Sequence, residues 1–191
     1  MKPTVLAALS AVSLLLAAAP ASADAEGPVA PAPSGFHADV EIDPTAYALS
    51  GHSIHVGLGL RHVRLDLGAF AMDLPHWAHG NDGYDVAFSG YGAKLHVFPF
   101  AEQAGLFLGV DGGVSHVLVR RQGTDLAVRQ TQGALGVHLG YRIGLPAGFY
   151  VTPWIGVSRQ FGTKDLTLAG ASFHQSPFNV FPAVHLGYRF L

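Results

Sequence analysis

The residues best suited to chemistry in this sequence are histidines and charged side chains that recur at alternate positions. His55, His96 and His138 each stand in a stretch where every second residue is small or charged, as do Asp66 and Asp111. Imidazole and carboxylate groups bind divalent metals, and histidine titrates near neutral pH. No spacing here has the specificity of an HExxH motif. We therefore predict no metal site and no cofactor, and we predict a packed polar network instead.

This predicted network would fill a narrow protein interior. Its cations would pair with its acids, and its histidines would complete the hydrogen bonds, because buried charges need partners. Glu41 and Asp43 are further acidic candidates. Replacing Arg142 or Arg189 by leucine should then lower the stability in detergent. The predicted members are Arg64, Asp66, Lys94, His96, Asp111, His138, Arg142, His185, Arg189 and His55.

A second polar group falls in stretches with strong turn chemistry. It consists of His76, His79, Asp82 and Asp85, with His174 from a later loop. Gly, Asn, Asp and Pro surround the first four residues, which predicts an exposed loop. The histidines could hold a metal ion weakly, but we favour solvated loop residues.

The dipeptide Ser115-His116 raises an enzymatic alternative. A nucleophile and its base need to be within hydrogen-bond reach of each other. Adjacent residues of a strand point to opposite faces, so these two side chains would need partners from neighbouring strands. No acyltransferase or deacylase motif is present, and we predict that the protein is not an enzyme. An enzymatic activity remains the alternative, and it would be abolished by His116→Ala.

These side chains belong to segments with the period of a β-strand. In the last twelve residues, VFPAVHLGYRFL, one face is apolar and the other carries His185, Gly187 and Arg189. The segment VHLGYRI, residues 137–143, has the same alternation of an apolar face with a face of histidine, glycine and arginine. Such two-sided strands suit either a soluble barrel with an apolar interior or a membrane barrel with an apolar exterior.

The composition favours the membrane barrel. The chain has 191 residues, of which 49% are hydrophobic and only 13% are charged, against about 25% charged residues in soluble domains. The mean hydropathy is +0.31. After the N-terminus no apolar run reaches the roughly 18 residues of a transmembrane helix. Only helices and closed barrels satisfy the backbone in lipid, so we predict a barrel.

Net charge and cysteine content exclude other classes. The formal net charge is −2 and the isoelectric point is near 6.6, neither of which indicates a nucleic-acid partner. The chain contains no cysteine, which excludes disulfides and thiolate sites.

The chain divides into three parts. Residues 1–23 have the basic start, apolar core and small-residue cleavage site of a secretory signal peptide. Residues 24–35 (DAEGPVAPAPSG) are predicted to be a disordered leader. Residues 36–191 are predicted to form an all-β, eight-stranded, antiparallel up-and-down transmembrane barrel with short turns at one end and longer loops at the other.

The alternation predicts seven strands. Residues 39–49 would supply the eighth, which comes first along the chain, although Pro44 also allows a helical turn that plugs one end. Pro153 should remove one ladder hydrogen bond. The seven strands are predicted at residues 53–60, 63–72, 84–98, 106–120, 126–144, 149–161 and 180–191.

From about Asp39 onward the chain resembles the small outer-membrane β-barrels of the OmpA/OmpX/OmpW-like superfamily. The terminal GYRF is similar to the closing signature that the barrel-assembly machinery recognises, although Leu191 follows the aromatic Phe190. The resemblance implies an outer-membrane location in a Gram-negative-type bacterium, contact with outer-membrane lipid, and assembly through the C-terminal strand.

We therefore expect a monomeric, non-catalytic outer-membrane barrel with a filled polar lumen. Its role would be structural, in the cell envelope, or would consist of presenting loops to partners. A general porin is not expected, because eight strands enclose too narrow a lumen. The alternatives are the lipid-modifying enzyme and a soluble, periplasmic, lipocalin-like binding barrel.

Overall fold

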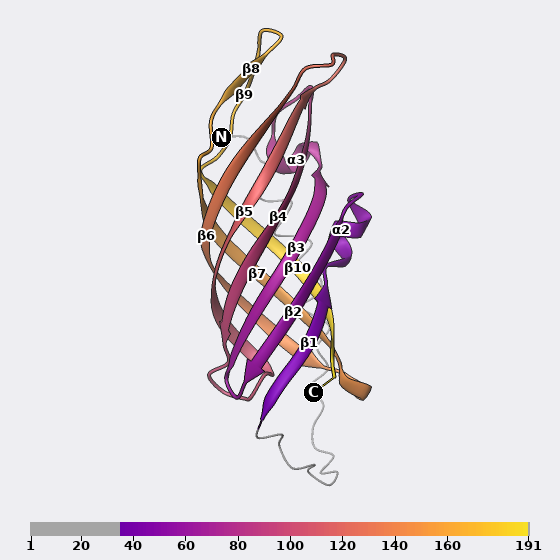
Figure 1. Cartoon of the computed structure of the whole chain (residues 1–191), viewed down its shortest axis with the longest axis vertical. Coiled ribbons are helices and arrows are strands. Elements are labelled where there is room, and N and C mark those ends of the chain that lie inside the picture. The colour runs from indigo at the N-terminus through magenta and orange to yellow at the C-terminus, as the bar shows by residue number, and fades with distance from the viewer. Residues whose placement is uncertain (1–34, 191) are drawn as a thin grey trace. The chain divides into compact units, whose positions relative to one another are not determined.

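A computed structural model describes residues 35–190 of the chain (Figure 1). The predicted signal peptide, nearly all of the predicted leader, and Leu191 lie outside the described residues. Within residues 35–190, none of the helices is long and apolar enough to span a membrane.

Eight strands close into a barrel in which every neighbouring pair is antiparallel. Each strand pairs with its neighbours in the sequence, and β1 pairs with β10 to close the ring. The predicted eight-stranded up-and-down barrel is confirmed. Its strands are β1 (Phe36–Ile42), β2 (His52–Leu60), β3 (Val63–Leu74), β4 (Tyr84–Val97), β5 (Gly105–Arg121), β6 (Ala127–Gly144), β7 (Phe149–Phe161) and β10 (Phe178–Arg189).

The first strand differs from the prediction. The strand predicted at residues 39–49 is wrong in extent, because β1 ends at Ile42 and helix α2 (Pro44–Ala48) follows it. Proline fits the first position of a helix, where no N–H is needed. The Asp43 side chain caps the helix by accepting a hydrogen bond from the Thr45 N–H at 2.9 Å. Thus the strand prediction holds for residues 39–42, and the helical alternative describes residues 44–48.

The connections divide between the two ends of the barrel, as predicted. The first end, here called the terminal end, carries residues 61–62, 98–104 and 145–148, the last with the short helix η2 (Pro146–Gly148). The described chain also begins and ends there, at β1 and β10. The opposite end, here called the loop end, carries α2, α3 (His76–His79), residues 122–126 and residues 162–177.

A small hairpin in the last loop was not predicted. Strands β8 (Leu166–Leu168) and β9 (Ala171–Phe173) pair with each other and extend from the loop end (Figure 1). Their side chains join an apolar cluster inside the barrel mouth, built on Tyr84, Val86, Val117, Val119 and Phe173. The Tyr84 hydroxyl donates a hydrogen bond to the Ala171 carbonyl. The hairpin therefore covers part of the loop end.

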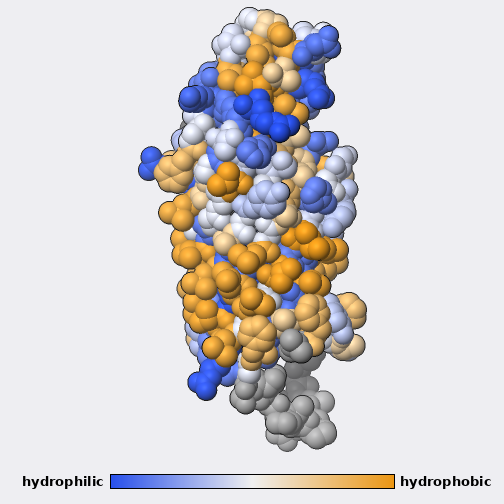
Figure 2. Space-filling model, viewed as in Figure 1, coloured by the Kyte–Doolittle hydropathy of each residue, from blue (hydrophilic) through white to orange (hydrophobic). Residues whose placement is uncertain are grey.

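Between this cluster and the terminal end, the apolar side chains point outward. Side chains of β2 alternate strictly between exposed and buried, and the exposed ones are mainly apolar. The same alternation runs through the C-terminal half of β6. Figure 2 shows the resulting apolar surface, with hydrophilic side chains gathered toward the loop end. Exposed members of this belt include Ile54, Val56, Leu58, Leu65, Leu67, Tyr91, Val110, Val114, Leu135, Val137, Leu139, Ile155, Val157, Val180 and Leu186.

The proline of β7 interrupts one ladder. The β6–β7 register runs to the pair Gly140–Trp154 and resumes at Ile143–Val151. Pro153, which lies in this gap, has no N–H to donate. The predicted weak point in the sheet is present here.

Candidate functional site

The charged interior is centred on Arg64, which projects inward from β3 and is fully buried. Its Nε and Nη2 atoms donate to the two carboxylate oxygens of Asp39, at 3.0 and 2.5 Å. Its Nη1 atom donates to Asp66 at 3.0 Å. Glu41 lies 3.3 Å from Nη2. One guanidinium group thus serves three carboxylates, as its planar set of donors permits.

Glu41, on β1, links this centre to the far wall of the barrel. Arg142 of β6 donates to it at 2.8 Å, and His185 of β10 contacts it through Nδ1 at 2.9 Å. All three side chains are buried. The Arg142 guanidinium also lies over the ring of Tyr150, 4.2 Å from its centroid. These contacts tie together strands that are far apart in the sequence.

Asp66 collects a second set of partners. His55 Nδ1 lies 2.8 Å from Asp66 Oδ1, and the ammonium group of Lys94 lies 3.6 Å from the same oxygen. Beside them the imidazole rings of His55 and His185 are 4.8 Å apart. Strands β2, β3, β4 and β10 all contribute to this part of the interior.

A third set lies along β5 and β6. His138 Nδ1 contacts Asp111 at 2.9 Å. The His138 ring meets that of His96 at 4.9 Å, and His96 stacks on Phe107 at 4.7 Å. Trp154 stands between His138 and His185, 5.6 Å from each. Ring contacts therefore connect His96, His138 and His185, and His185 in turn lies beside His55.

The formal charges of the polar network balance. The inward-facing acids of the network are Asp39, Glu41, Asp66 and Asp111, and its cations are Arg64, Lys94, Arg142 and Arg189; within it, Asp111 contacts His138 and Arg189 contacts a backbone carbonyl. With neutral histidines the formal sum is zero. Paired charges of this kind avoid the several kcal/mol that an isolated buried ion costs.

The structure brings nine of the ten predicted network residues into these acid–base and ring contacts. The tenth, Arg189, contacts no acid in the described chain and donates to the Gln103 carbonyl at 3.2 Å. Asp43, predicted as an acidic partner, caps α2 instead. Asp39 was missed, although it shares the alternate-position face of Glu41. Gln103 was also missed, since its loop gives no periodic signal.

The ends of the interior are filled by other side chains. At the terminal end Phe98, Phe107 and Gln103 are buried, and Gln103 Nε2 donates to the carbonyls of Arg61 and Val63 at 2.7 and 2.9 Å. At the loop end, the apolar cluster beneath the β8–β9 hairpin fills the interior in the same way. The polar network therefore lies between two packed layers.

The loop histidines do not converge on one centre. The rings of His76 and His79 are 5.1 Å apart, but His76 and Asp85 each contact Gln122. His174 pairs with Asp165 at 2.9 Å. Across the described residues, no group of three or more His, Asp or Glu side chains is arranged to hold a metal ion.

Two loop groups have shifted acidities. Burial, and then the neighbouring His76, lowers the pKa of His79. Its Nδ1 accepts a hydrogen bond from the Asn81 N–H at 3.2 Å, which requires the unprotonated nitrogen. The hydrogen bond from His174, and then one from the Gln175 N–H, lowers the pKa of the exposed Asp165.

Asn81 also forms hydrogen bonds with the backbone of His174, at 2.8 and 3.0 Å. Thus the α3 loop is fastened to the hairpin loop.

Ser115 and His116 lie on opposite faces of β5. His116 is exposed on the outer face, and its Nδ1 contacts the Thr131 hydroxyl of β6 at 3.0 Å. On its other side the residue paired with it is Ser89 of β4. The structure gives His116 no acidic partner among the described residues.

His116 is one of six exposed, outward-facing polar residues, here called the polar ring, that lie toward the loop end of strands β2 to β7. On β7, the outward-facing residues between this polar ring and the terminal end carry no charge, and they extend from Phe149 to Val157. That distance is about 26 Å along the strand at ~3.3 Å per residue, or about 20 Å of height at a ~40° tilt. The polar ring consists of His52, Asp73, Ser89, His116, Thr131 and Arg159.

Comparison of the chain with protein-family models and with curated proteins finds no match. Among solved structures, the chain is similar to the N-terminal β-barrel domain of Pseudomonas aeruginosa OprF, with 15% identity, a TM-score of 0.45, and coverage of 81% of this chain and 97% of that chain. It is similar in the same way to Neisserial surface protein A (NspA), with 15% identity, a TM-score of 0.48, and coverage of 81% and 96%.

Proposed function

We propose that this protein is a small outer-membrane β-barrel protein with a filled polar lumen, exported through its signal peptide. Its role is non-catalytic: it contributes to envelope integrity or presents its loops to partners. The chain acts as a monomer, and its C-terminal strand is the segment that the barrel-assembly machinery receives.

The observation that carries the proposal is the reversed polarity of the barrel wall. Large apolar side chains face outward around the ring, whereas Arg64, Asp66 and Arg142 are buried inside. In water this arrangement exposes the apolar side chains and buries the ions. In lipid the outward side chains are solvated, and a closed barrel satisfies its backbone hydrogen bonds. The soluble, lipocalin-like alternative requires an apolar interior, and the described interior is charged.

The polar ring gives the proposed depth in the membrane. The belt below it is about 20 Å tall, close to the apolar band of about 25 Å in barrels of this kind. The terminal end then faces the periplasm, and the loop end, with α3 and the hairpin, faces outward. Buried side chains occupy both ends of the interior, so the proposed role uses the outer surfaces rather than a channel.

A folding experiment on the mature chain, residues 24–191, tests this proposal. The chain is unfolded in denaturant and diluted with or without detergent micelles, and circular dichroism and gel mobility before and after boiling are compared. We expect β-structure and a heat-dependent mobility shift only with micelles. Folding to the same β-content in buffer alone would contradict the membrane assignment.

A further inference from the structure

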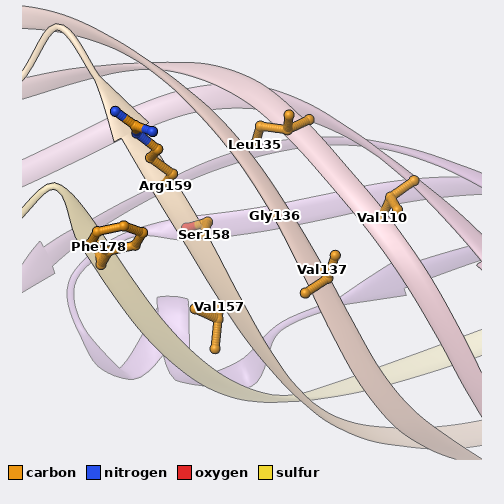
Figure 3. A pocket seen from close by; sticks show the side chains of 8 residues that line it. All are labelled: Val110, Leu135, Gly136, Val137, Val157, Ser158, Arg159 and Phe178. Atoms are coloured by element: carbon orange, nitrogen blue, oxygen red, sulfur yellow. The ribbon is translucent and has the colours of Figure 1, made fainter.

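The membrane-facing wall contains a shallow groove of about 340 Å³ over strands β5, β6 and β7 and the start of β10. Val110, Leu135, Val137 and Val157 line its length, with Gly136 and Ser158 between them (Figure 3). Leu135 and Val137 are among the most exposed aliphatic side chains, at 62% and 61%. The groove is therefore apolar along most of its length and open toward the surroundings of the barrel.

One end of the groove is different in character. Arg159 and Phe178 stand at the end nearer the loops (Figure 3), and Arg159 belongs to the polar ring. Among the described residues no carboxylate pairs with Arg159, and its guanidinium lies over the Phe161 ring, 5.3 Å from the centroid. A cation without an anion thus stands where the apolar belt ends.

This combination matches an amphiphile in both polarity and orientation. An acyl chain needs an apolar track that runs into the belt, and a phosphate needs a donor at the depth of the headgroups. Arginine binds phosphate through paired N–H donors. A cation near a membrane surface contributes measurably to the binding of anionic lipid.

We propose that this groove is a binding site for a phosphate-bearing anionic lipid. One acyl chain lies along Leu135, Val137 and Val157, and the phosphate is held by Arg159. The inference rests on the proposed membrane location and adds the chemical class of lipid that the wall selects. The same contacts do not favour a zwitterionic lipid, whose ammonium group would approach the guanidinium.

The chain offers matched controls for each half of the site. Arg120 is also exposed and points outward from β5, but it lies opposite Asp85 in register and does not line the groove. Val56 is exposed on β2, away from the groove. Arg159→Gln removes the charge at the groove, and Arg120→Gln is its control. Val137→Phe fills the groove, and Val56→Phe is the control that enlarges a side chain elsewhere on the wall.

The test uses the full mature chain refolded in neutral detergent, with the heat-dependent gel shift recorded for every variant. Phosphatidylglycerol and phosphatidylcholine of identical acyl chains are titrated in, and bound lipid is counted by native mass spectrometry. We expect one phosphatidylglycerol to be retained preferentially. Arg159→Gln should lower its affinity about fivefold, and Val137→Phe should weaken both lipids. The two control variants should behave like the parent chain.

Several outcomes would overturn the inference. One is a loss of affinity for phosphatidylglycerol in Arg120→Gln equal to that in Arg159→Gln, and another is no loss of this affinity in Arg159→Gln. A third is displacement of the lipid by free glycerol phosphate at matched concentration, which would indicate a site for the headgroup alone. In each of these cases the gel shift still establishes the membrane barrel. A chain that folds fully without micelles would overturn both proposals together.

Discussion

Replacing Arg64 by leucine should destabilise the barrel more than any other single change to its interior charges. The guanidinium donates to both oxygens of Asp39 and to Asp66, and it lies 3.3 Å from Glu41. After the change, Glu41 keeps Arg142 and His185, and Asp66 keeps its histidine and lysine. Asp39 is left with Arg142 at 4.0 Å as its nearest cation.

The size of the effect follows from that carboxylate, which loses its hydrogen-bonded cation and keeps only the longer contact with Arg142. Removing one partner of a buried pair costs about 3–5 kcal/mol, because the other charge remains without compensation. Replacing Asp39 by leucine as well removes the uncompensated charge. The double variant Arg64→Leu/Asp39→Leu should therefore recover most of the loss, and Arg64→Lys, which keeps one charge but fewer donors, should fall between the parent chain and Arg64→Leu.

Urea titration in micelles measures these differences. The chain has two tryptophans, and Trp77 is exposed at the loop end. A Trp77→Phe background leaves Trp154, which lies inside the barrel with the Lys94 ammonium 5.0 Å from its ring, as the only emitter. A loss below about 1 kcal/mol for Arg64→Leu, or a double variant no more stable than the single one, would refute the account of the interior given above.

Three further outcomes are expected. Arg142→Leu should cost about 3 kcal/mol or more in the same titration, whereas Arg189→Leu, which loses one hydrogen bond to a backbone carbonyl, should cost about 1 kcal/mol; equal losses would contradict the difference in their partners. Because the folded-state pKa of His79 lies below its ordinary value, its contribution to loop stability is present above about pH 6.5 and is lost as the pH falls; the protection factor of the Asn81 amide, which is its exchange rate relative to the intrinsic rate at each pH, should fall in that range, and a constant protection factor would count against it. Overexpression should leave the mass of lipid A unchanged, and a mass shift that disappears in His116→Ala would establish the enzymatic alternative.

The parts of the fold that follow from alternation were predictable. In β6 and β10 the sequence repeats the same order of apolar, small and charged residues, and the period of two assigns each side chain to a face without any knowledge of the partner strand. Seven strands and both sets of connections follow from this rule. The pairing of Glu41 with Arg142 and His185 needs the closed ring, and the sequence alone indicates only that all three share the inner face.

Other features depend on local or long-range contacts that carry no period. The segment after Asp43 is helical because a side-chain cap and Pro44 favour a turn over an extended strand. The β8–β9 hairpin turns at Ala169 and Gly170, both with positive φ. Alanine is an uncommon residue in that conformation, so the usual Asn-Gly signal of such a turn is missing. Arg189 meets Gln103 only because the terminal-end loop folds inward.

The interior and the exterior of this barrel have different capacities for function. Inside, Asp39, Asp66 and Glu41 already pair with the chain's own cations, and the arginine of β3 uses its donors on these carboxylates. A ligand entering there would have to displace an ion pair and leave a charge without compensation. Outside, the outward arginine of β7 contacts an aromatic ring but no carboxylate among the described residues, and the loop end presents side chains to solvent. Binding is therefore least costly on the wall and at the loops, which is where a partner or a lipid should be sought.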